Sequence, residues 1–414
     1  MGRFWLECVA CNKFIPIEEL RGVCACGGTL LVRYDLDWAK RLFTKESIAE
    51  YATDMWRYRK LMPLRDETSI VSLGEGFTPL IRMRNIPQGM PLKNVWVKRE
   101  DLNPTGSFKA RGMSAALTLL KENGLKKAAV GSNGNAASAL AAYAARAEIA
   151  AFVFIPKDCP AFIIEECLHY GADVCLVDGY IHDASRIVAD GQQEQGWFNV
   201  GTLKEPGRVE GKKTMGLELA EQFGWTLPDV IVYPTGGGSG VIGMWKAFRE
   251  LRELGLVKSP LPRFVSVQEA GCTPLVDAMA ETGKKTVPTI GEKQSRMTAV
   301  TSSPTGMRVP LPPDLNLLVN ILREMNGTAV AVSAEEIRAA QKQLGFVGIS
   351  ASPEGAAAWA GTLRLSESGW IRPEEKVVVF NTAHALKYGS FPLLGTVPKA
   401  KDYMEWLAAH HPIH

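Results

Sequence analysis

The sequence predicts an α/β protein built on parallel sheets whose two faces are covered by helices. From about residue 94 onward, short apolar runs rich in β-branched residues alternate with longer segments of helical pattern. Turns rich in glycine or asparagine join several of these runs directly to the helix that follows. No solenoid-length repeat and no low-complexity tract interrupts the alternation. Strands that alternate with helices in this way favour parallel pairing.

The expected elements follow in chain order. Residues 36–70 are charged and helical in pattern, and another helix begins near Lys109. Apolar runs predict strands at 95–97, 128–131, 151–155, 174–177, 230–233, 264–268 and 377–381. Helical periodicity predicts helices at 135–145, 161–170, 183–195, 214–223 and 241–254. The segment 302–313 is rich in Pro, Ser, Thr and Gly, which predicts a long loop beside an active site.

Composition narrows the class of function. The chain has 414 residues, of which 46% are hydrophobic and 22% charged, as in a globular protein of two or three domains. The formal net charge of +3 gives no support for a nucleic-acid or membrane-surface partner. The first residues lack the apolar stretch of a signal peptide, and no apolar run is long enough to cross a membrane. We expect a cytoplasmic protein with reduced thiols that acts on a small molecule.

Four cysteines lie in the first 26 residues, as Cys8-x2-Cys11 and Cys24-x-Cys26. Two close thiol pairs separated by a short stretch fit a tetrahedral zinc site. The alternative is a small ribbon that folds without metal, because the second pair is C-x-C rather than C-x2-C. A redox role is disfavoured, since no βαβ pattern surrounds the first pair.

The segment 101–112 reads Asp-Leu-Asn-Pro-Thr-Gly-Ser-Phe-Lys-Ala-Arg-Gly and places Lys109 in the first turn of a helix. The helix dipole favours anions at this end, so a lysine here is more easily kept neutral. A Schiff-base nucleophile must be a neutral amine. The alternative is a solvated surface lysine, one of 47 lysines and arginines.

A glycine-rich turn, Pro-Thr-Gly-Gly-Gly-Ser-Gly at 234–240, follows the strand 230–233 and opens the helix 241–254. The backbone N–H groups of such a turn and the helix dipole together suit a phosphate. The turn lacks the Lys-Ser/Thr of a nucleotide P-loop and the G-x-G-x-x-G spacing of a dinucleotide site. The expected phosphate belongs to a smaller cofactor or substrate, and the alternative is a glycine loop without a ligand.

Two further junctions carry polar side chains. The turn 131–135, Gly-Ser-Asn-Gly-Asn, suits a carboxylate or a polar ring, although Ser and Asn are also ordinary helix caps. Thr382, His384 and Lys387 follow the last predicted strand, where an open α/β sheet binds its ligands. The alternative is a capping threonine with a surface histidine and lysine. A Schiff-base lysine, a phosphate cup and a partner for a pyridine nitrogen together suggest pyridoxal 5′-phosphate.

These motifs are similar to those of the threonine synthase family among the fold-type II pyridoxal-phosphate enzymes. The resemblance rests on Gly-Glu-Gly-Phe-Thr-Pro-Leu at 74–80, Lys-Arg-Glu-Asp-Leu-Asn-Pro-Thr-Gly-Ser-Phe-Lys at 98–109 and Arg-Val-Glu-Gly-Lys-Lys-Thr at 208–214. The glycine turn, the segment 382–387 and the cysteine ribbon fit the same order. The resemblance extends over about residues 5–395 and is more specific for the cofactor and the fold than for the substrate.

The resemblance implies a tryptophan synthase β-like fold of two parallel-sheet α/β domains. Its implied parts are a zinc-ribbon-like segment at 1–35, a large cofactor-binding domain at 36–114 and 206–414, and a small mobile domain at 115–205. It also implies that Lys109 holds the cofactor as a Schiff base, with Phe108 packed beside it and Asn135 bonded to its 3′ oxygen. Thr382 is implied to meet the pyridine nitrogen. The implied phosphate ligands are Gly236, Gly237, Gly238, Ser239 and Gly240.

The implied reaction converts O-phospho-L-homoserine and water into L-threonine and phosphate, with Lys109 moving protons at Cα and Cβ. The candidate substrate-binding residues are Ser107, Arg111, Ser132, Lys212 and Arg308. For each charged candidate the alternative is a surface or domain-interface ion pair. We expect the enzyme to act as a homodimer or a monomer.

Departures from the family pattern motivate two other hypotheses. Ala110 stands where many threonine synthases carry Asp, Asn133 lies in Ser-Asn-Gly-Asn, and Ala383 and Ala385 replace two usual glycines. The first alternative is a β-eliminating or β-replacing lyase, such as a threonine/serine dehydratase or a cysteate-synthase-like enzyme. The second is a metabolite-binding protein without catalysis.

Overall fold

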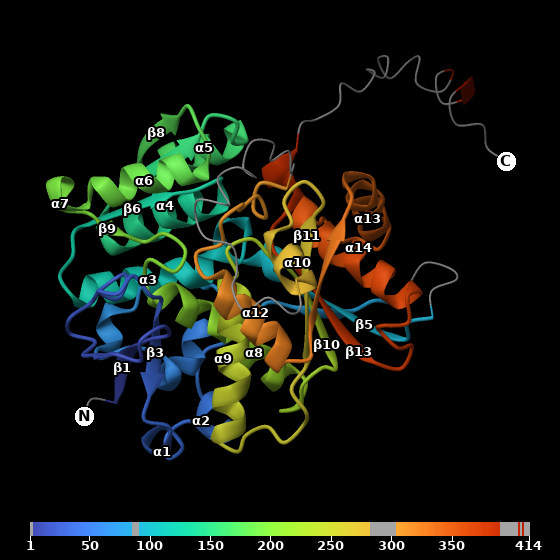
Figure 1. Ribbon diagram of the computed structural model, residues 1–414, viewed down its shortest axis with the longest axis horizontal. Coiled ribbons are helices and arrows are strands. Elements are labelled where there is room, and N and C mark those ends of the chain that lie inside the picture. The colour runs from blue at the N-terminus through green and yellow to red at the C-terminus, as the bar shows by residue number, and fades with distance from the viewer. Residues whose placement is uncertain (1–2, 85–90, 282–303, 390–404, 406–407, 410–414) are drawn as a thin grey trace.

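The computed structural model describes residues 3–84, 91–281, 304–389, 405 and 408–409. Three sheets carry the described fold (Figure 1). The strands are β1 (Phe4–Cys8), β2 (Phe14–Ile15), β3 (Leu30–Tyr34), β4 (Leu80–Arg82), β5 (Asn94–Arg99), β6 (Lys127–Gly131), β7 (Ala150–Pro156), β8 (Asp173–Val177), β9 (Phe198–Asn199), β10 (Val230–Pro234), β11 (Arg263–Glu269), β12 (Thr328–Val332) and β13 (Lys376–Asn381). The α-helices are α1 (Leu36–Ala39), α2 (Lys45–Ala49), α3 (Lys109–Glu122), α4 (Asn135–Ala147), α5 (Ala161–His169), α6 (Ile181–Asp190), α7 (Gln192–Gln195), α8 (Gly207–Gln222), α9 (Ser239–Glu253), α10 (Pro274–Ala280), α12 (Leu315–Glu324), α13 (Ala334–Phe346) and α14 (Pro353–Glu367).

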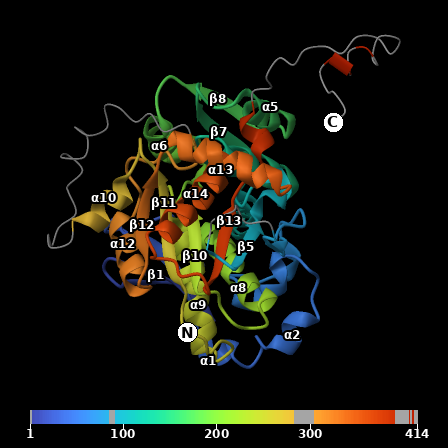
Figure 2. The ribbon, with the colours of Figure 1, turned by 90° about the vertical axis from the view of Figure 1, so that its right-hand side faces the viewer.

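The larger sheet has the strand order β12-β11-β10-β13-β5-β4. All its neighbouring strands are parallel except β4, which pairs antiparallel with β5. Successive side chains of β10 enter different cores, because strand residues alternate between faces. Ile231 and Tyr233 pack with α8, α9 and α12, whereas Val230 and Val232 pack with α13 and α14. Figure 2 shows α13 and α14 lying across the strands of this sheet.

The smaller sheet has the order β8-β7-β6-β9, and all its pairs are parallel. Ala128 and Val130 of β6 pack against α3 and α4, whereas Ala129 faces α6 and Trp197. Both α/β sheets are therefore buried on two faces, as the sequence predicted. In Figure 1 the smaller sheet and its helices lie at the upper left, beside the larger sheet.

The N-terminal strands form a three-stranded antiparallel sheet of order β2-β1-β3. We call this element, residues 4–34, the N-terminal ribbon. Its apolar side chains belong to the same core as α8 and α9, so the ribbon is packed onto the larger α/β unit. Within the described part of the chain, none of the helices combines the length and hydropathy that a membrane span requires.

Each predicted strand is present, but three helical predictions differ from the structure. Residues 36–70 form α1, α2 and two 3₁₀ helices, because Asp35, Thr44, Asp54 and Asp66 each cap a new start. The helix predicted at 183–195 is divided into α6 and α7 at Gly191. Helix α8 begins at Gly207 rather than at residue 214. Its residues are buried on nearly every side, so no amphipathic stripe marks its first two turns.

Candidate active site

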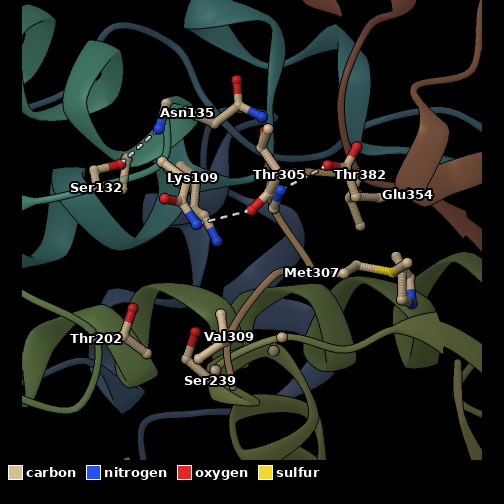
Figure 3. A pocket seen from close by; sticks show the side chains of 18 of the residues that line it. Lys109, Ser132, Asn135, Thr202, Ser239, Thr305, Met307, Val309, Glu354 and Thr382 are labelled. Atoms are coloured by element: carbon tan, nitrogen blue, oxygen red, sulfur yellow. Dashed lines mark hydrogen bonds between the residues drawn. The ribbon is translucent and has the colours of Figure 1, made fainter. Parts of the chain in front are cut away.

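A cavity opens where the carboxyl ends of β6, β10 and β13 meet α3. Side chains from both α/β units line it (Figure 3). In Figure 3, Lys109, Ser132 and Asn135 lie on one side, and Thr202 and Ser239 lie on the other. The lining residues are Phe108, Lys109, Gly131, Ser132, Asn133, Gly134, Asn135, Ala136, Ile181, Thr202, Arg208, Tyr233, Pro234, Gly236, Gly237, Gly238, Ser239, Gly240, Thr305, Gly306, Met307, Val309, Glu354, Thr382 and Tyr388. Every residue expected to bind the cofactor is among them.

Lys109 is the first residue of α3 and follows a tight turn in which Thr105 and Gly106 have φ of 59° and 63°. The segment is fixed from the far end of the chain, because Ser107 forms an antiparallel bridge with Ala383. The ammonium nitrogen of Lys109 lies 4.1 Å from the centre of the Phe108 ring. The lysine is therefore held on a rigid element with an aromatic ring beside it.

Burial, with a smaller contribution from the positive charge of Arg208, lowers the pKa of Lys109 from 10.5 to about 7. The carboxylate of Glu354 acts in the opposite direction. A large fraction of Lys109 is neutral at physiological pH, which is the form that attacks a carbonyl carbon.

The glycine turn at 236–240 forms the wall opposite Lys109. Gly238 is the N-cap of α9 with φ of 80°, and among the described residues no side chain caps the first turn of this helix. The first N–H groups of α9 are thus available to an anion, with the helix dipole behind them. A Cβ at Gly238 would overlap the side chain of Leu318, so only glycine fits both the backbone and the packing.

Polar side chains complete the upper wall of the cavity. Ser132 Oγ accepts hydrogen bonds from the N–H groups of Gly134 at 3.0 Å and Ala137 at 3.2 Å, which orders the start of α4. Asn135 Nδ2 donates to the Tyr388 hydroxyl at 2.6 Å. Within the described residues, Oδ1 of Asn135 has no partner. One end of this amide is anchored, and the other is available to a ligand.

Arg208 and Glu354 line the cavity but were not among the predicted site residues. Arg208 Nη1 donates to the carbonyl of Val200 at 2.7 Å, while Nε and Nη2 find no partner in the described chain. Glu354 Oε1 accepts the N–H of Gly306 at 2.9 Å. Arg208 begins the motif at 208–214, so that motif was a usable signal, whereas nothing in the sequence around Glu354 marked it.

Four of the five expected substrate contacts do not line this cavity. Arg111 is fully buried and bonded through all three guanidinium nitrogens to Glu100 and Glu218, so this expectation is corrected: its donors are already used. Arg308 pairs with Asp158 at 2.8 Å.

Lys212 and Ser107 are buried behind the cavity wall. The ammonium nitrogen of Lys212 lies 5.0 Å from the centre of the Phe108 ring, and burial lowers its pKa well below the usual value. Ser132 is the fifth candidate and does reach the cavity.

Two other residues were predicted to follow the last strand beside Thr382. The His384 side chain accepts a hydrogen bond from the Leu386 N–H, and Lys387 forms an ion pair with Glu166 at 2.5 Å.

The loop predicted at 302–313 is irregular over its described part, 304–313. Thr305, Gly306, Met307 and Val309 line the cavity. The first two residues of the predicted loop lie outside the described residues. The loop thus closes one side of the cavity, beside Glu354.

The four N-terminal cysteines converge in the ribbon. The Sγ atoms of Cys8, Cys11, Cys24 and Cys26 all lie within 4.8 Å of one another, which suits one tetrahedral ion. This cluster is separate from the cavity and lies at the turns of the ribbon.

The residues present fit pyridoxal phosphate. The cavity offers a lysine of lowered pKa, an uncapped helix start for a phosphate, an amide with a free end and the hydroxyl of Thr382 at the end of β13. These are the groups that this cofactor requires of a protein.

Solved structures share this fold. Maize serine racemase superposes with a TM-score of 0.63 at 24% identity, covering 81% of this chain and 93% of that chain. A threonine deaminase from Solanum lycopersicum superposes with a TM-score of 0.61 at 21% identity, covering 83% and 85%. At this identity the likeness establishes the fold, which is the predicted fold-type II architecture.

Sequence comparison gives the family. The family model described as pyridoxal-phosphate dependent enzyme matches residues 71–383. The threonine synthase of Methanocaldococcus jannaschii is 34% identical over 92% of this chain and 92% of its own. That of Methanosarcina acetivorans is 34% identical over 93% and 92%. The chain therefore belongs to the pyridoxal-phosphate dependent enzyme family and, within it, to the threonine synthase family.

Proposed function

We propose that this protein is a threonine synthase, which converts O-phospho-L-homoserine and water into L-threonine and phosphate. The observation that carries the proposal is that two different groups suited to bind a phosphate line one cavity. The uncapped start of α9 suits the phosphate of the cofactor, and the unpaired guanidinium nitrogens of Arg208 suit a second phosphate, on the substrate. The curated relatives that match over most of the chain are threonine synthases, which supports the same substrate.

The proposed roles of the side chains follow from their positions. Bound pyridoxal phosphate supplies an electron sink for negative charge at the substrate Cα. Lys109, as a neutral amine, takes the Cα proton, gives it up, and can then take a Cβ proton. Phosphate leaves from Cγ, a proton returns to Cγ, and water adds at Cβ. Arg208 and Ser132 hold the substrate, and the loop at 304–309 with Glu354 excludes bulk water. The Thr382 hydroxyl, being neutral, leaves the cofactor nitrogen without a carboxylate partner, which favours elimination and replacement over transamination.

A parallel substrate assay tests the proposal. The purified holoenzyme is incubated separately with O-phospho-L-homoserine, L-threonine and O-phospho-L-serine, and phosphate, threonine and 2-oxo acids are quantified. We expect equal amounts of phosphate and threonine from O-phospho-L-homoserine. A 2-oxo acid formed from threonine, without phosphate release from O-phospho-L-homoserine, would instead identify a dehydratase. No turnover of any substrate by a protein with bound cofactor would indicate a metabolite-binding protein.

We further propose that Cys8, Cys11, Cys24 and Cys26 bind one zinc ion, supported by the convergence of their thiols.

We also propose that residues 115–205 form a small mobile domain, which moves relative to a larger domain formed by residues 36–114 and 206–414. The smaller sheet, at 127–199, lies within the first of these ranges. Closure of this domain would bring Ser132 and Asn135 toward the glycine turn.

The remaining expectations concern the whole protein. We propose a cytoplasmic enzyme that works as a homodimer or a monomer, without a nucleic-acid or membrane partner. The near balance of charge supports the absence of a polyanionic partner. Light scattering coupled to gel filtration distinguishes the two oligomeric states.

A further inference from the structure

Residues 200–208, which lead from β9 into the first turn of α8, carry two residues of the cavity wall, Thr202 and Arg208. Arg208 lies in the first turn of α8 and donates from Nη1 to the carbonyl of Val200 within the same segment. The direction of its guanidinium group therefore depends on the backbone of residues 200–208. Contacts that fix the backbone of residues 200–208 therefore also fix the position of Arg208.

The N-terminal ribbon contacts α8 through Tyr34, the last residue of β3. The Tyr34 hydroxyl donates to Glu210 Oε2 at 2.6 Å in the protein interior. The Tyr34 ring lies under two ammonium groups, with Lys213 Nζ at 4.0 Å and Lys246 Nζ at 4.5 Å from its centre. Lys213 and Lys246 also pair with Glu210 at 2.7 and 3.1 Å. The ribbon thus contributes Tyr34 to a buried cluster of charged side chains around Glu210, which lies two residues after Arg208 in α8.

The ribbon also supports the preceding backbone. A Cβ at Gly22 would overlap the carbonyl oxygen of Lys204, so the two backbones are in direct contact. Leu203 belongs to the core cluster that contains Leu6 and Ile15 of the ribbon. In Figure 1 the ribbon, in dark blue, lies beside α8 and α9. The ribbon therefore contacts both the start of α8 and the segment that leads into it.

Opposite sides of α8 face the ribbon and the active site. Glu210 faces Tyr34, whereas Lys212 lies against Phe108 and Arg208 lines the cavity. All residues from Gly207 to Ala220 are buried. Close-packed elements transmit displacement because no solvent layer absorbs it. A shift of α8 at Glu210 consequently reaches Arg208.

From these contacts we propose that Tyr34 is a positioning residue: the N-terminal ribbon holds the first turn of α8 so that Arg208 faces the substrate phosphate. This inference rests on the proposed function for its kinetic consequence. It gives the ribbon a part in substrate binding although none of its residues enters the cavity.

The test replaces Tyr34 by Phe, which keeps the ring and removes only the hydroxyl donor to Glu210. We expect KM for O-phospho-L-homoserine to rise roughly fivefold, while kcat changes less than twofold, because the lost interaction concerns binding of the substrate phosphate. The visible absorbance of the bound cofactor should be unchanged. Amide hydrogen exchange of residues 203–212 should become faster.

Two controls and a second variant make the result specific. Glu7→Gln breaks the half-exposed Glu7–Arg33 ion pair of the same ribbon and should leave KM and hydrogen exchange unchanged. Gly22→Ala forces the ribbon away from Lys204 and should raise KM as Tyr34→Phe does. Gly345→Ala adds the same methyl group in open space and should have no effect.

One result would overturn the inference: Tyr34→Phe lowers the melting temperature but leaves KM and the hydrogen exchange of residues 203–212 unchanged. The ribbon would then only stabilise the fold. The exchange measurement needs no substrate. If the wild-type enzyme does not convert O-phospho-L-homoserine, the proposed function fails, and exchange at 203–212 still decides whether Tyr34 holds α8.

Discussion

The backbone N–H of Phe108 donates to the carbonyl oxygen of Thr382 at 3.0 Å, across more than half of the chain. The N–H of His384 donates in turn to the carbonyl of Gly106 at 2.9 Å. These bonds join the lysine-bearing turn to the end of β13, so Lys109 and Thr382 belong to one rigid unit. The two groups proposed to meet opposite parts of the cofactor are thus fixed relative to each other before any ligand binds.

Attachment of the cofactor should depend on pH with a midpoint near 7. The pKa of Lys109 is lowered to about 7 in the folded protein, so its neutral fraction rises as the pH passes upward through that value. The rate at which the apoenzyme acquires the visible absorbance of bound pyridoxal phosphate should rise over the same range and level off above it. Stopped-flow absorbance measures this rate.

Two variants should move this midpoint in opposite directions. Arg208→Met removes a positive charge that disfavours protonated Lys109, so the pKa and the midpoint should rise. Glu354→Gln removes a carboxylate that favours protonated Lys109, so both should fall. Lys109→Ala should give no absorbance band at any pH. A wild-type midpoint near 10 would contradict the described environment of the lysine.

Gly238→Ala should weaken cofactor binding and lower stability. Its φ of 80° is unfavourable for alanine by about 1–2 kcal/mol, and the new methyl group meets Leu318 at the start of α9. Gly255→Ala is the matched control, because Gly255 has φ of 74° but open space around its Cα. The control should lose a similar amount of stability from strain alone and keep its cofactor affinity. Fluorescence titration of each apoenzyme with pyridoxal phosphate measures the affinity, and equal affinities would contradict the proposed phosphate cup.

The residues at the strand–helix junctions could be predicted because their signals are local. Lys109, Asn135, Ser239 and Thr382 each lie where an apolar run meets a turn or a helix. The carboxyl ends of parallel strands share one edge of a sheet, so such residues tend to meet. The fold class followed from the same alternation of runs.

The motif at 208–214 drew attention to Arg208, but local signals could not distinguish its role from that of Arg111. Both are arginines in charged helical segments, and either could lie at the surface. Arg111 is buried because Glu100 and Glu218 neutralise it, and Glu218 is distant in the sequence. Arg208 is buried, and no carboxylate in the described part of the chain bonds to its Nε or Nη2. Only the packing of α3 against α8 separates the structural arginine from the one in the cavity.

Arg111→Met should lower stability rather than substrate affinity. The change leaves Glu100 without its guanidinium partner and leaves only Lys98 paired to Glu218, at 2.8 Å. Breaking a buried pair on one side costs about 3–5 kcal/mol. Urea unfolding measures the loss, and KM of the folded fraction should stay near the wild-type value. Arg372→Met is the surface control, because the Arg372 side chain is 67% exposed and should contribute only about 0–1 kcal/mol. A raised KM with an unchanged free energy of unfolding would contradict this prediction and indicate that Arg111 binds the substrate.

The cysteine cluster should hold one zinc ion per chain. Loss of this ion should destabilise the N-terminal ribbon before the rest of the fold. Cys24→Ser and Cys26→Ser each remove one of four thiols that lie within 4.8 Å of one another, so the purified variants should contain little zinc by mass spectrometry of the metal. Cys175→Ser changes an exposed thiol on β8 and should keep full zinc content. Because the ribbon shares its core with α8 and α9, metal loss should also lower the melting temperature and speed exchange at 203–212. A wild-type protein without zinc but with slow exchange throughout 4–34 would show that the ribbon folds without metal.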